Sequence, residues 1–484
     1  MTETTCLFKI LEHCKISPAV TQVSTASLPL TFLDIPCCGP LCFNQLFFYE
    51  FPHPTHHFVD TILPALKHSL SLTLQHFHPL AGILLCPPPP NEPYIHYTNN
   101  DSVSLTIAES TSNFNHIISK HPHVSMIDLK ELAPFVPKMP PITSTNNDIF
   151  VFPIVVFQIT FFPNNGLCIG ITSRHVIDAR SSSHFMKSWA IINSQTSSED
   201  YLSNFLDEKS LPVFDREVIK NPDGVKDILL RDYFQWRGDW VNCLLGKTTD
   251  DSYAKYEDAV KGTFVFSQKK IERLKSWVSR RWKKLNQEES PPYLSKFVVT
   301  CAFIWVCFLK TKRDSKNEDD NLEEYFIFSA DCRNLMEYPI PETYMGNCLT
   351  LGQCGISAKR KELLDEEKGV VTAIKTIAQK ISKLRQKPLE DAESWAHDFK
   401  KLSTILGIQT LYVTGSPNFG LYGVDFGFGK PKKVEMVHGQ DGLALVESGD
   451  EEGGGIEVGL IFKKAEMEDF ISVFERGFAE INSD

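Results

Sequence analysis

The sequence lacks any long apolar segment. No stretch of its 484 residues approaches the roughly 20 consecutive apolar residues that a membrane-spanning helix needs. The first residues include an acid, Glu3, and too short an apolar run for a secretory signal peptide. We therefore expect a cytoplasmic protein without a membrane partner.

An excess of positive charge is also missing. The chain has 49 Lys and Arg residues against 60 Asp and Glu residues, which gives a formal net charge of −11. Proteins that bind nucleic acids normally present a basic face, so we expect no nucleic-acid partner. One basic cleft for a phosphorylated ligand stays compatible with this balance, because net charge says little about a single pocket.

The cysteines lack the spacing of a metal site. There are 13 of them, an odd number scattered along the chain, with no Cys-x-x-Cys and with Cys37 directly beside Cys38. We interpret them as reduced thiols that mostly pack in the core, and we expect no bound metal. A short tandem repeat is absent too, which argues against a solenoid.

Strand and helix patterns are mixed in both halves of the chain. The first half has strand patterns at 7–11, 47–51, 149–162 and 167–176 and helix patterns at 58–74 and 181–193; the second half has strand patterns at 262–266, 326–330 and 455–462, helix patterns at 271–282, 295–311, 359–386 and 464–480, and a charged loop at 312–323. Residues 194–225 are polar and weakly periodic. We interpret them as a crossover between an N-terminal domain, 1–193, and a C-terminal domain, 226–484, both of the α/β class.

The densest chemistry lies in Thr172-Ser-Arg-His-Val-Ile-Asp-Ala-Arg180, where a strand pattern runs into a helix pattern. A histidine at this point could simply be a satisfied core or surface residue. The end of a strand, however, holds a side chain rigidly against a cleft, and histidine titrates near neutral pH. His175 is therefore a candidate general base.

This segment resembles the plant BAHD acyltransferases. The hallmark of that family is His-x-x-x-Asp followed by a helix that ends in Trp-Ala, and Asp178 lies 11 residues before Trp189-Ala190, as the pattern requires. Tyr344-Met-Gly-Asn-Cys348 is similar to the Tyr-Phe-Gly-Asn-Cys signature of the glycoside-acylating branch, which includes anthocyanin and phenolic glucoside malonyltransferases.

Three further motifs agree with the family. Asp425-Phe-Gly-Phe-Gly429 resembles its Asp-Phe-Gly-Trp-Gly, and both Asp331-Cys-Arg333 and His76-Phe-His-Pro-Leu-Ala-Gly82 are typical of it. The resemblance implies two similar-sized, mixed-sheet α/β domains of the chloramphenicol-acetyltransferase-like type, with a tunnel between them. It implies a monomeric enzyme with no bound cofactor that transfers an acyl group from acyl-CoA, its co-substrate, to a hydroxyl or amine of a small plant specialised metabolite, such as a glycoside.

The motif departs from the family pattern by one residue. Only Val176 and Ile177 separate His175 from Asp178, so the spacing is His-x-x-Asp. Because side chains alternate faces along a strand, one missing residue matters. His175 could keep its direction on a tightened loop, or it could swing away while Asp178 keeps its contacts. In a third interpretation Arg174 occupies the catalytic position, where it could not act as a base.

The resemblance also implies roles around His175. Asp178 would point away from substrate and pair with Arg333, and Asp425 would shape its own loop. Residues expected to line the channel are Tyr344, Gly346, Asn347, Thr414 and Ser416. The phosphates of CoA call for basic residues, for which the candidates are Lys430, Lys432 and Lys433, with the run Arg280–Lys284 as another option.

The acyl donor and the reaction itself stay open at this point. Malonyl-specific relatives place an Arg four residues after the motif Asp, and this sequence has Ser182 there, with Arg180 two positions away. An aromatic or acetyl donor fits equally. The rival hypotheses are a relative whose shortened motif performs elimination or cyclisation on a small metabolite, and a non-catalytic relative.

Overall fold

A six-stranded mixed sheet forms the centre of the first half of the molecule. The computed structural model describes residues 7–19, 25–39, 41–119, 124–195, 206–245, 258–285, 290–312, 321–350, 355–395, 397–398, 410–437, 442–450 and 453–483. The sheet has the order β1 (Phe8–Ile16), β6 (Val103–Ser110), β10 (Val155–Phe162), β11 (Gly166–Arg174), β3 (Cys42–Glu50) and β18 (Lys433–Glu435). Strands β10 and β11 are buried along their whole length, as expected for apolar central strands.

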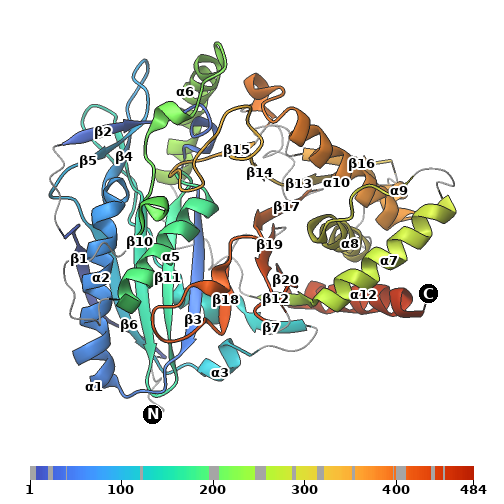
Figure 1. Ribbon diagram of the computed structural model, residues 1–484, viewed down its shortest axis with the longest axis horizontal. Helices are drawn as coiled ribbons and strands as arrows, with labels where there is room; N and C mark the ends of the chain where they lie inside the picture. Colours follow the sequence, from blue (N-terminus) through green and yellow to red (C-terminus); the bar gives the residue numbers. More distant parts are fainter. Residues whose placement is uncertain are drawn as a thin grey trace.

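Two helices cover one face of this sheet. They are α2 (Leu63–His76) and α5 (Ala179–Gln195), which pack against each other (Figure 1). The helix predicted at 58–74 begins earlier, as α1 (Thr55–His57) and a π-helical turn, Phe58–Ile62, that continues into α2. The indole Nε1 of Trp189 on α5 donates to Ser69 Oγ on α2 at 3.0 Å.

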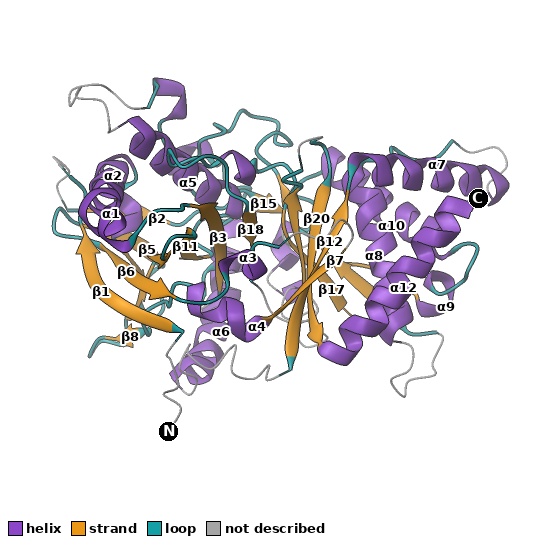
Figure 2. Ribbon diagram, turned by 90° about the horizontal axis from the view of Figure 1, so that it is seen from below, coloured by secondary structure: helices purple, strands orange, loops and turns teal. Residues whose placement is uncertain are grey.

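A seven-stranded mixed sheet forms the second half. Its order is β16 (Gly355–Lys359), β13 (Glu323–Ile327), β17 (Thr410–Gly415), β19 (Gly442–Glu447), β20 (Ile456–Lys463), β12 (Ala259–Phe266) and β7 (Val124–Asp128). The helices α7 (Gln268–Leu285), α8 (Lys296–Thr311), α10 (Gly369–Gln386) and α12 (Lys464–Ser483) gather on one side of it (Figure 2). Helix α8 is buried nearly all round, as its apolar sequence predicts.

The prediction of one continuous helix at 359–386 is wrong. The chain forms a short helix, α9 (Arg360–Leu363), and then breaks before α10. At the break, the carboxylate of Asp365 accepts the main-chain N–H groups of Glu367 and Lys368 at 3.0 and 2.8 Å. Such a local hydrogen-bonded turn competes with the helix and ends it.

Helix α6 (Val225–Leu245) was not predicted, because its sequence shows little helical periodicity. Its residues Leu229 and Tyr233 pack into the core of the first half. A smaller five-stranded sheet also belongs to this part, with the order β2 (Ala26–Pro29), β5 (Tyr94–Tyr97), β4 (Ile83–Cys86), β9 (Phe150–Pro153) and β8 (Thr143–Ser144). Two short helices complete it, α3 (Phe114–Ile117) and α4 (Leu129–Leu132).

The two large sheets exchange a strand each. Strand β7, from the first half of the sequence, pairs with β12, and β18, from the second half, pairs with β3. At this exchange the buried carboxylate of Glu435 forms ion pairs with Lys261 and Lys433. The predicted boundaries at 193 and 226 stay a prediction, and 196–205 of the crossover and 313–320 of the charged loop lie outside the described residues.

The α/β class with mixed sheets is confirmed. Within the described ranges, no helix has both the length and the hydropathy to cross a membrane.

Candidate active site

His175 lies in the turn that joins β11 to α5. Strand β11 ends at Arg174 and α5 begins at Ala179. The side chains of Val176 and Ile177, each 1% exposed, anchor the turn in the first core. The His175 ring lies edge-on to that of Phe43, with 5.4 Å between ring centroids.

His175 is partly exposed, but the protein packed around its ring disfavours the charged form and lowers its pKa to about 4. The imidazole is therefore neutral at physiological pH and has a nitrogen lone pair that can take a proton.

Asp178 closes the turn at its other end. Its Oδ1 accepts the main-chain N–H of Ser181 at 2.8 Å, the contact that caps the start of a helix. Its Oδ2 lies 2.8 Å from Arg333 Nη1, and both side chains are buried. The expected partner, Arg333, is thus in place, and both carboxylate oxygens are engaged by the protein.

Arg333 ties two distant loops to the start of α5. Its Nη1 lies 3.1 Å from Asp331 Oδ1, and its Nη2 donates to the carbonyl of Tyr344 at 3.1 Å. Burial opposes the charge of the guanidinium, but the carboxylate of Asp178 raises the pKa of Arg333 above its usual range. A two-stranded ladder, β14 (Ala330–Asp331) with β15 (Leu349–Thr350), brackets this segment.

Asn347 connects the turn to a third loop. Its side-chain Nδ2 donates to the main-chain carbonyl of His175 at 2.8 Å and to Asp34 Oδ1 at 3.1 Å. Its main-chain N–H donates to the same Asp34 oxygen at 2.9 Å. The other oxygen of Asp34 accepts from the N–H and the hydroxyl of Thr31, both at 2.8 Å. Sequence reasoning missed Asp34, whose only signal is a carboxylate that ends the apolar stretch 30–34.

Arg216 holds the segment 344–348 from the side of the crossover. Its Nη1 donates to the Tyr344 hydroxyl at 2.7 Å and to the Met345 carbonyl at 2.8 Å. A Cβ at Gly346 would lie 2.2 Å from that same nitrogen, so any larger residue would displace Arg216 from these hydrogen bonds. Tyr344 is 1% exposed and Asn347 is fully buried. The channel-lining role of these residues stays a prediction. Their contacts hold the segment 344–348 against the His175 turn. Arg216 was also missed, because it lies in a stretch without periodicity.

Asp425 organises its own loop. Its Oδ1 accepts the N–H groups of Gly427 and Gly429 at 2.8 and 2.9 Å. Both glycines have positive φ, 95° and 88°, which glycine adopts without steric cost. The intervening Phe426 packs edge-on against Trp189 of α5, with centroids 5.0 Å apart. These contacts fit the structural role expected of Asp425.

Thr414 and Ser416 lie at the end of β17. Thr414 pairs with Ala444 in the sheet, and the Ser416 hydroxyl accepts the N–H of Asn418 at 3.3 Å. None of the contacts in the described ranges joins either residue to His175, so their channel role stays a prediction.

The basic candidates for CoA differ in their surroundings. Lys430 is exposed, and Lys432 forms an ion pair with Glu50 at 2.9 Å. Lys433 is 4% exposed and pairs with Glu435 at 3.0 Å, which leaves it inside the protein. The run Arg280–Lys284 belongs to α7, at the opposite end of the molecule from α5 (Figure 1).

Arg174 is buried on the first sheet. Its Nε donates to the carbonyl of Pro153 at 3.0 Å, and its guanidinium lies 5.0 Å from the ring centre of Phe152. These contacts give Arg174 a packing role and do not favour the interpretation that it occupies the catalytic position.

Arg180, the arginine nearest to the position where malonyl-specific relatives bind the donor carboxylate, is engaged elsewhere, and so is Ser182, which occupies that position. Arg180 lies 2.8 Å from Asp331 and 3.6 Å from Glu342. The buried hydroxyl of Ser182 donates to Gln45 Oε1 at 3.4 Å.

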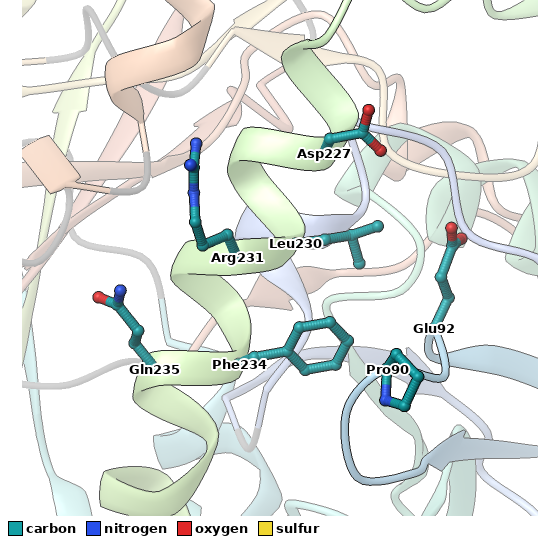
Figure 3. Close-up of a pocket in the computed structure, with 7 residues that line it drawn as sticks. All are labelled: Pro90, Glu92, Asp227, Leu230, Arg231, Phe234 and Gln235. Atoms are coloured by element: carbon teal, nitrogen blue, oxygen red, sulfur yellow. The ribbon is translucent and has the colours of Figure 1, made fainter.

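An open groove with a volume of about 550 Å³ lies elsewhere, between α6 and the loop after β4 (Figure 3). Leu230, Phe234 and Pro90 form its apolar wall, and it contains no predicted site residue. In the part of the chain that the structure describes, no cluster of three or more His, Cys, Asp or Glu residues could hold a metal ion. The tunnel expected at His175 stays a prediction.

Comparisons with known proteins agree over nearly the whole chain. Residues 9–476 match the profile of the Transferase family. A coumaroyl-CoA:anthocyanidin 3-O-glucoside-6''-O-coumaroyltransferase of Arabidopsis thaliana is 36% identical over 479 residues, which cover 97% of each chain. A malonyl-coenzyme A:anthocyanin 3-O-glucoside-6''-O-malonyltransferase of Dahlia pinnata is 35% identical over 485 residues and also covers 97% of each chain.

Solved structures share the fold. Vinorine synthase matches with a TM-score of 0.62 at 20% identity, over 96% of each chain. The F. graminearum protein TRI101, complexed with coenzyme A and T-2 mycotoxin, matches with a TM-score of 0.59 at 14% identity, over 92% of this chain and 96% of its own. The predicted acyltransferase type of fold is confirmed.

Proposed function

Because this chain belongs to the BAHD family of acyltransferases, we propose that it transfers an acyl group from acyl-CoA to a hydroxyl of a glycosylated plant metabolite, with His175 as the general base. Relatives named for transfer to anthocyanin and anthocyanidin glucosides, at 35% and 36% identity over 97% of the chain, support the acceptor class.

In the proposed reaction, the acceptor hydroxyl gives its proton to the imidazole of His175 as its oxygen attacks the thioester carbonyl. The new C–O bond forms as the carbonyl π electrons move to oxygen. Collapse of this tetrahedral intermediate breaks the C–S bond, and the CoA thiolate takes the proton from the imidazolium. No metal or bound cofactor takes part. A positioned base of this kind is worth roughly 10²–10⁴ in rate.

The observation that carries this proposal is the placement of His175 on a turn that is fixed at both ends. Burial keeps the pKa of His175 at about 4, so the base form is present throughout the physiological range. Asn347 holds the His175 carbonyl at 2.8 Å, and Asp178 is held by Arg333 at 2.8 Å. The short His-x-x-Asp spacing is therefore compatible with a rigid, tightened loop.

We further propose a donor without a free carboxylate, such as an aromatic acyl-CoA. Ser182 offers no positive charge, and the guanidinium of Arg180 is already paired with Asp331 and Glu342. The expected CoA contacts of Lys430 and Lys432 belong to the same proposal.

The test is an assay of purified protein with acetyl-, malonyl- and coumaroyl-CoA against a panel of glucosides, followed by detection of free thiol and of product mass. We expect thiol release with an aromatic donor, and a decrease of at least ~10² in turnover for His175→Ala. His184→Ala is the matched control. It removes a second partly buried histidine of pKa about 4, nine residues further along, and should keep most of the turnover.

Two outcomes oppose the proposal. Full turnover in His175→Ala would exclude it as the base. A folded wild-type protein that releases no thiol with any donor, yet converts an acceptor alone, would favour elimination or cyclisation instead.

A further inference from the structure

The direction of the His175 ring depends on how its main chain is held. The residue stands directly after β11, in a turn of only four residues before α5. Asp178, which follows the histidine by three positions, fixes the far end of this turn through its ion pair with Arg333. At the near end, the main-chain carbonyl of His175 accepts a hydrogen bond from Nδ2 of Asn347. Asn347 belongs to a loop 172 positions further along the chain.

The amide of Asn347 could contact that carbonyl in either of two orientations. Its nitrogen donates and its oxygen accepts, so a flipped amide would set oxygen against the His175 carbonyl. The carboxylate of Asp34 selects the orientation, because Oδ1 accepts both the N–H and the Nδ2 of Asn347, at 2.9 and 3.1 Å. A carboxylate oxygen accepts hydrogen bonds and does not donate them, so it pairs with the Nδ2 of Asn347 and not with its Oδ1. Hydrogen bonds to a charged acceptor are about twice as strong as those between neutral groups.

The position of Asp34 is itself determined by protein contacts. Its second oxygen accepts two hydrogen bonds from Thr31 at 2.8 Å each, and its side chain is fully buried. Burial opposes the charge of the Arg216 guanidinium, but the carboxylate of Asp34 raises the pKa of Arg216 above its usual range. The negative charge therefore has a positive counterpart in the same buried region.

We propose that Asp34 is a positioning residue that acts through the amide of Asn347 to hold the main chain, and thereby the ring, of His175. This inference rests on the proposed function for its kinetic readout. The rival explanation is a purely structural one, in which the bond between Asp34 and Asn347 merely fastens two loops together.

A charge swap separates the two explanations. In the double variant Asp34→Asn/Asn347→Asp, the new amide at position 34 can donate to the carboxylate at position 347, so one side-chain contact between the loops is regained. The main-chain N–H of residue 347, which donates to Asp34 in the wild type, then faces the amide nitrogen and loses its acceptor. The carboxylate at position 347, however, now faces the His175 carbonyl without a proton to donate. Asn347→Asp alone breaks both the side-chain contact with Asp34 and the contact with His175. Asp34→Asn alone keeps one oxygen for the donors of residue 347 but sets its nitrogen against the donors of Thr31.

We expect the swap to recover part of the melting temperature that Asn347→Asp loses, without recovering the turnover that this variant loses. The kcat of the swap should stay about 10²-fold below wild type, because small displacements of a catalytic group cost that much. The KM values for both substrates should remain within a few-fold. Recovery of kcat together with stability would overturn the proposal in favour of loop fastening.

Asn193→Asp is the matched control. Asn193 also donates from a buried Nδ2 to a carbonyl, that of Phe426 at 2.7 Å, but it lies near the end of α5 that is farther from the turn. The variant should lose stability with little change in kcat. A similar loss of kcat in this control would mean that the kinetic effect is a general consequence of destabilisation.

An NMR readout distinguishes failure of this inference from failure of the proposed function. The ring nitrogen signals of His175, assigned by their absence in His175→Ala, report its environment whether or not the protein turns over acyl-CoA. We expect them to shift or broaden in the swap. If they are unchanged there, the positioning role is wrong, even for a protein that proves inactive as an acyltransferase.

Discussion

The chemistry of His175 depends on its surroundings more than on its own residue type. The free imidazole has a pKa near 6.5, and burial lowers it to about 4. Between pH 6.5 and pH 4 the imidazole takes up a proton in the unfolded chain but not in the folded chain. Protonation of His175 therefore leaves the free energy of unfolding unchanged above about pH 6.5 and lowers it progressively as the pH falls toward 4.

The residue-scale prediction concerns this pKa. Phe43→Leu removes the ring edge beside His175 and lets water approach, so the pKa should rise toward 6.5. The variant should lose kcat/KM between pH 6.5 and 5, where the wild type keeps it, and the two profiles should converge near pH 8. Phe48→Leu, on the same strand but packed against Phe135, is the control. A wild-type profile that already declines at pH 6.5 would contradict the assignment.

At the scale of elements, the start of α5 combines three interactions in few residues. Val176 and Ile177 enter the core, and Asp178 both caps the helix and pairs with Arg333. Each interaction fixes one position of the turn, so the spacing between them has no slack. This explains how a shortened motif can still present a defined histidine.

Inserting one Gly between Ile177 and Asp178, which restores the family spacing, tests this explanation. We expect lower stability by on the order of 3 kcal/mol, because the buried Asp178–Arg333 pair or the two core side chains must move. Acyl transfer should not increase. The control is one Gly inserted between Asn164 and Asn165, in the exposed turn at the other end of β11, which should be tolerated. A gain in transfer with unchanged melting temperature would show that the short motif has impaired the enzyme.

At the scale of the molecule, the halves are interlocked by their exchanged strands. Strand β7 lies at the edge of the second sheet, and β18 at the edge of the first. Glu435, brought by β18, compensates Lys261 and Lys433, all of them buried. Removing one partner from such a group leaves a buried charge uncompensated, which costs about 3–5 kcal/mol.

The corresponding prediction is that the halves do not fold alone. A chain of 1–225 would lack β18 and a chain of 226–484 would lack β7, so each would expose a buried sheet edge. Expressed separately they should be insoluble or unfolded by circular dichroism, and co-expression should restore a soluble complex. The control is the full chain cleaved within 313–320, which should stay associated. Independent folding of either half, with its own cooperative transition, would contradict this view.

Much of the fold was readable from the sequence because it is encoded locally. The hairpin of β10 and β11 follows from two β-rich runs around a Pro-Asn-Asn-Gly turn, and α8 from its continuous apolar residues. Helix α6 was not predicted, because its polar and aromatic residues mix without a clear helical period. Its buried residues pack against parts of the first core that lie far away in the sequence.

The sequence by itself determined the family, the order of the main strands and helices, and His175 with its short spacing to Asp178. Only the tertiary structure decided which side chains meet. Asp34 and Asn347 are 313 residues apart, and nothing in either neighbourhood indicates the other. The same is true of the neutral state of His175, because a pKa is set by burial and by nearby charges, which exist only once the distant loops have come together.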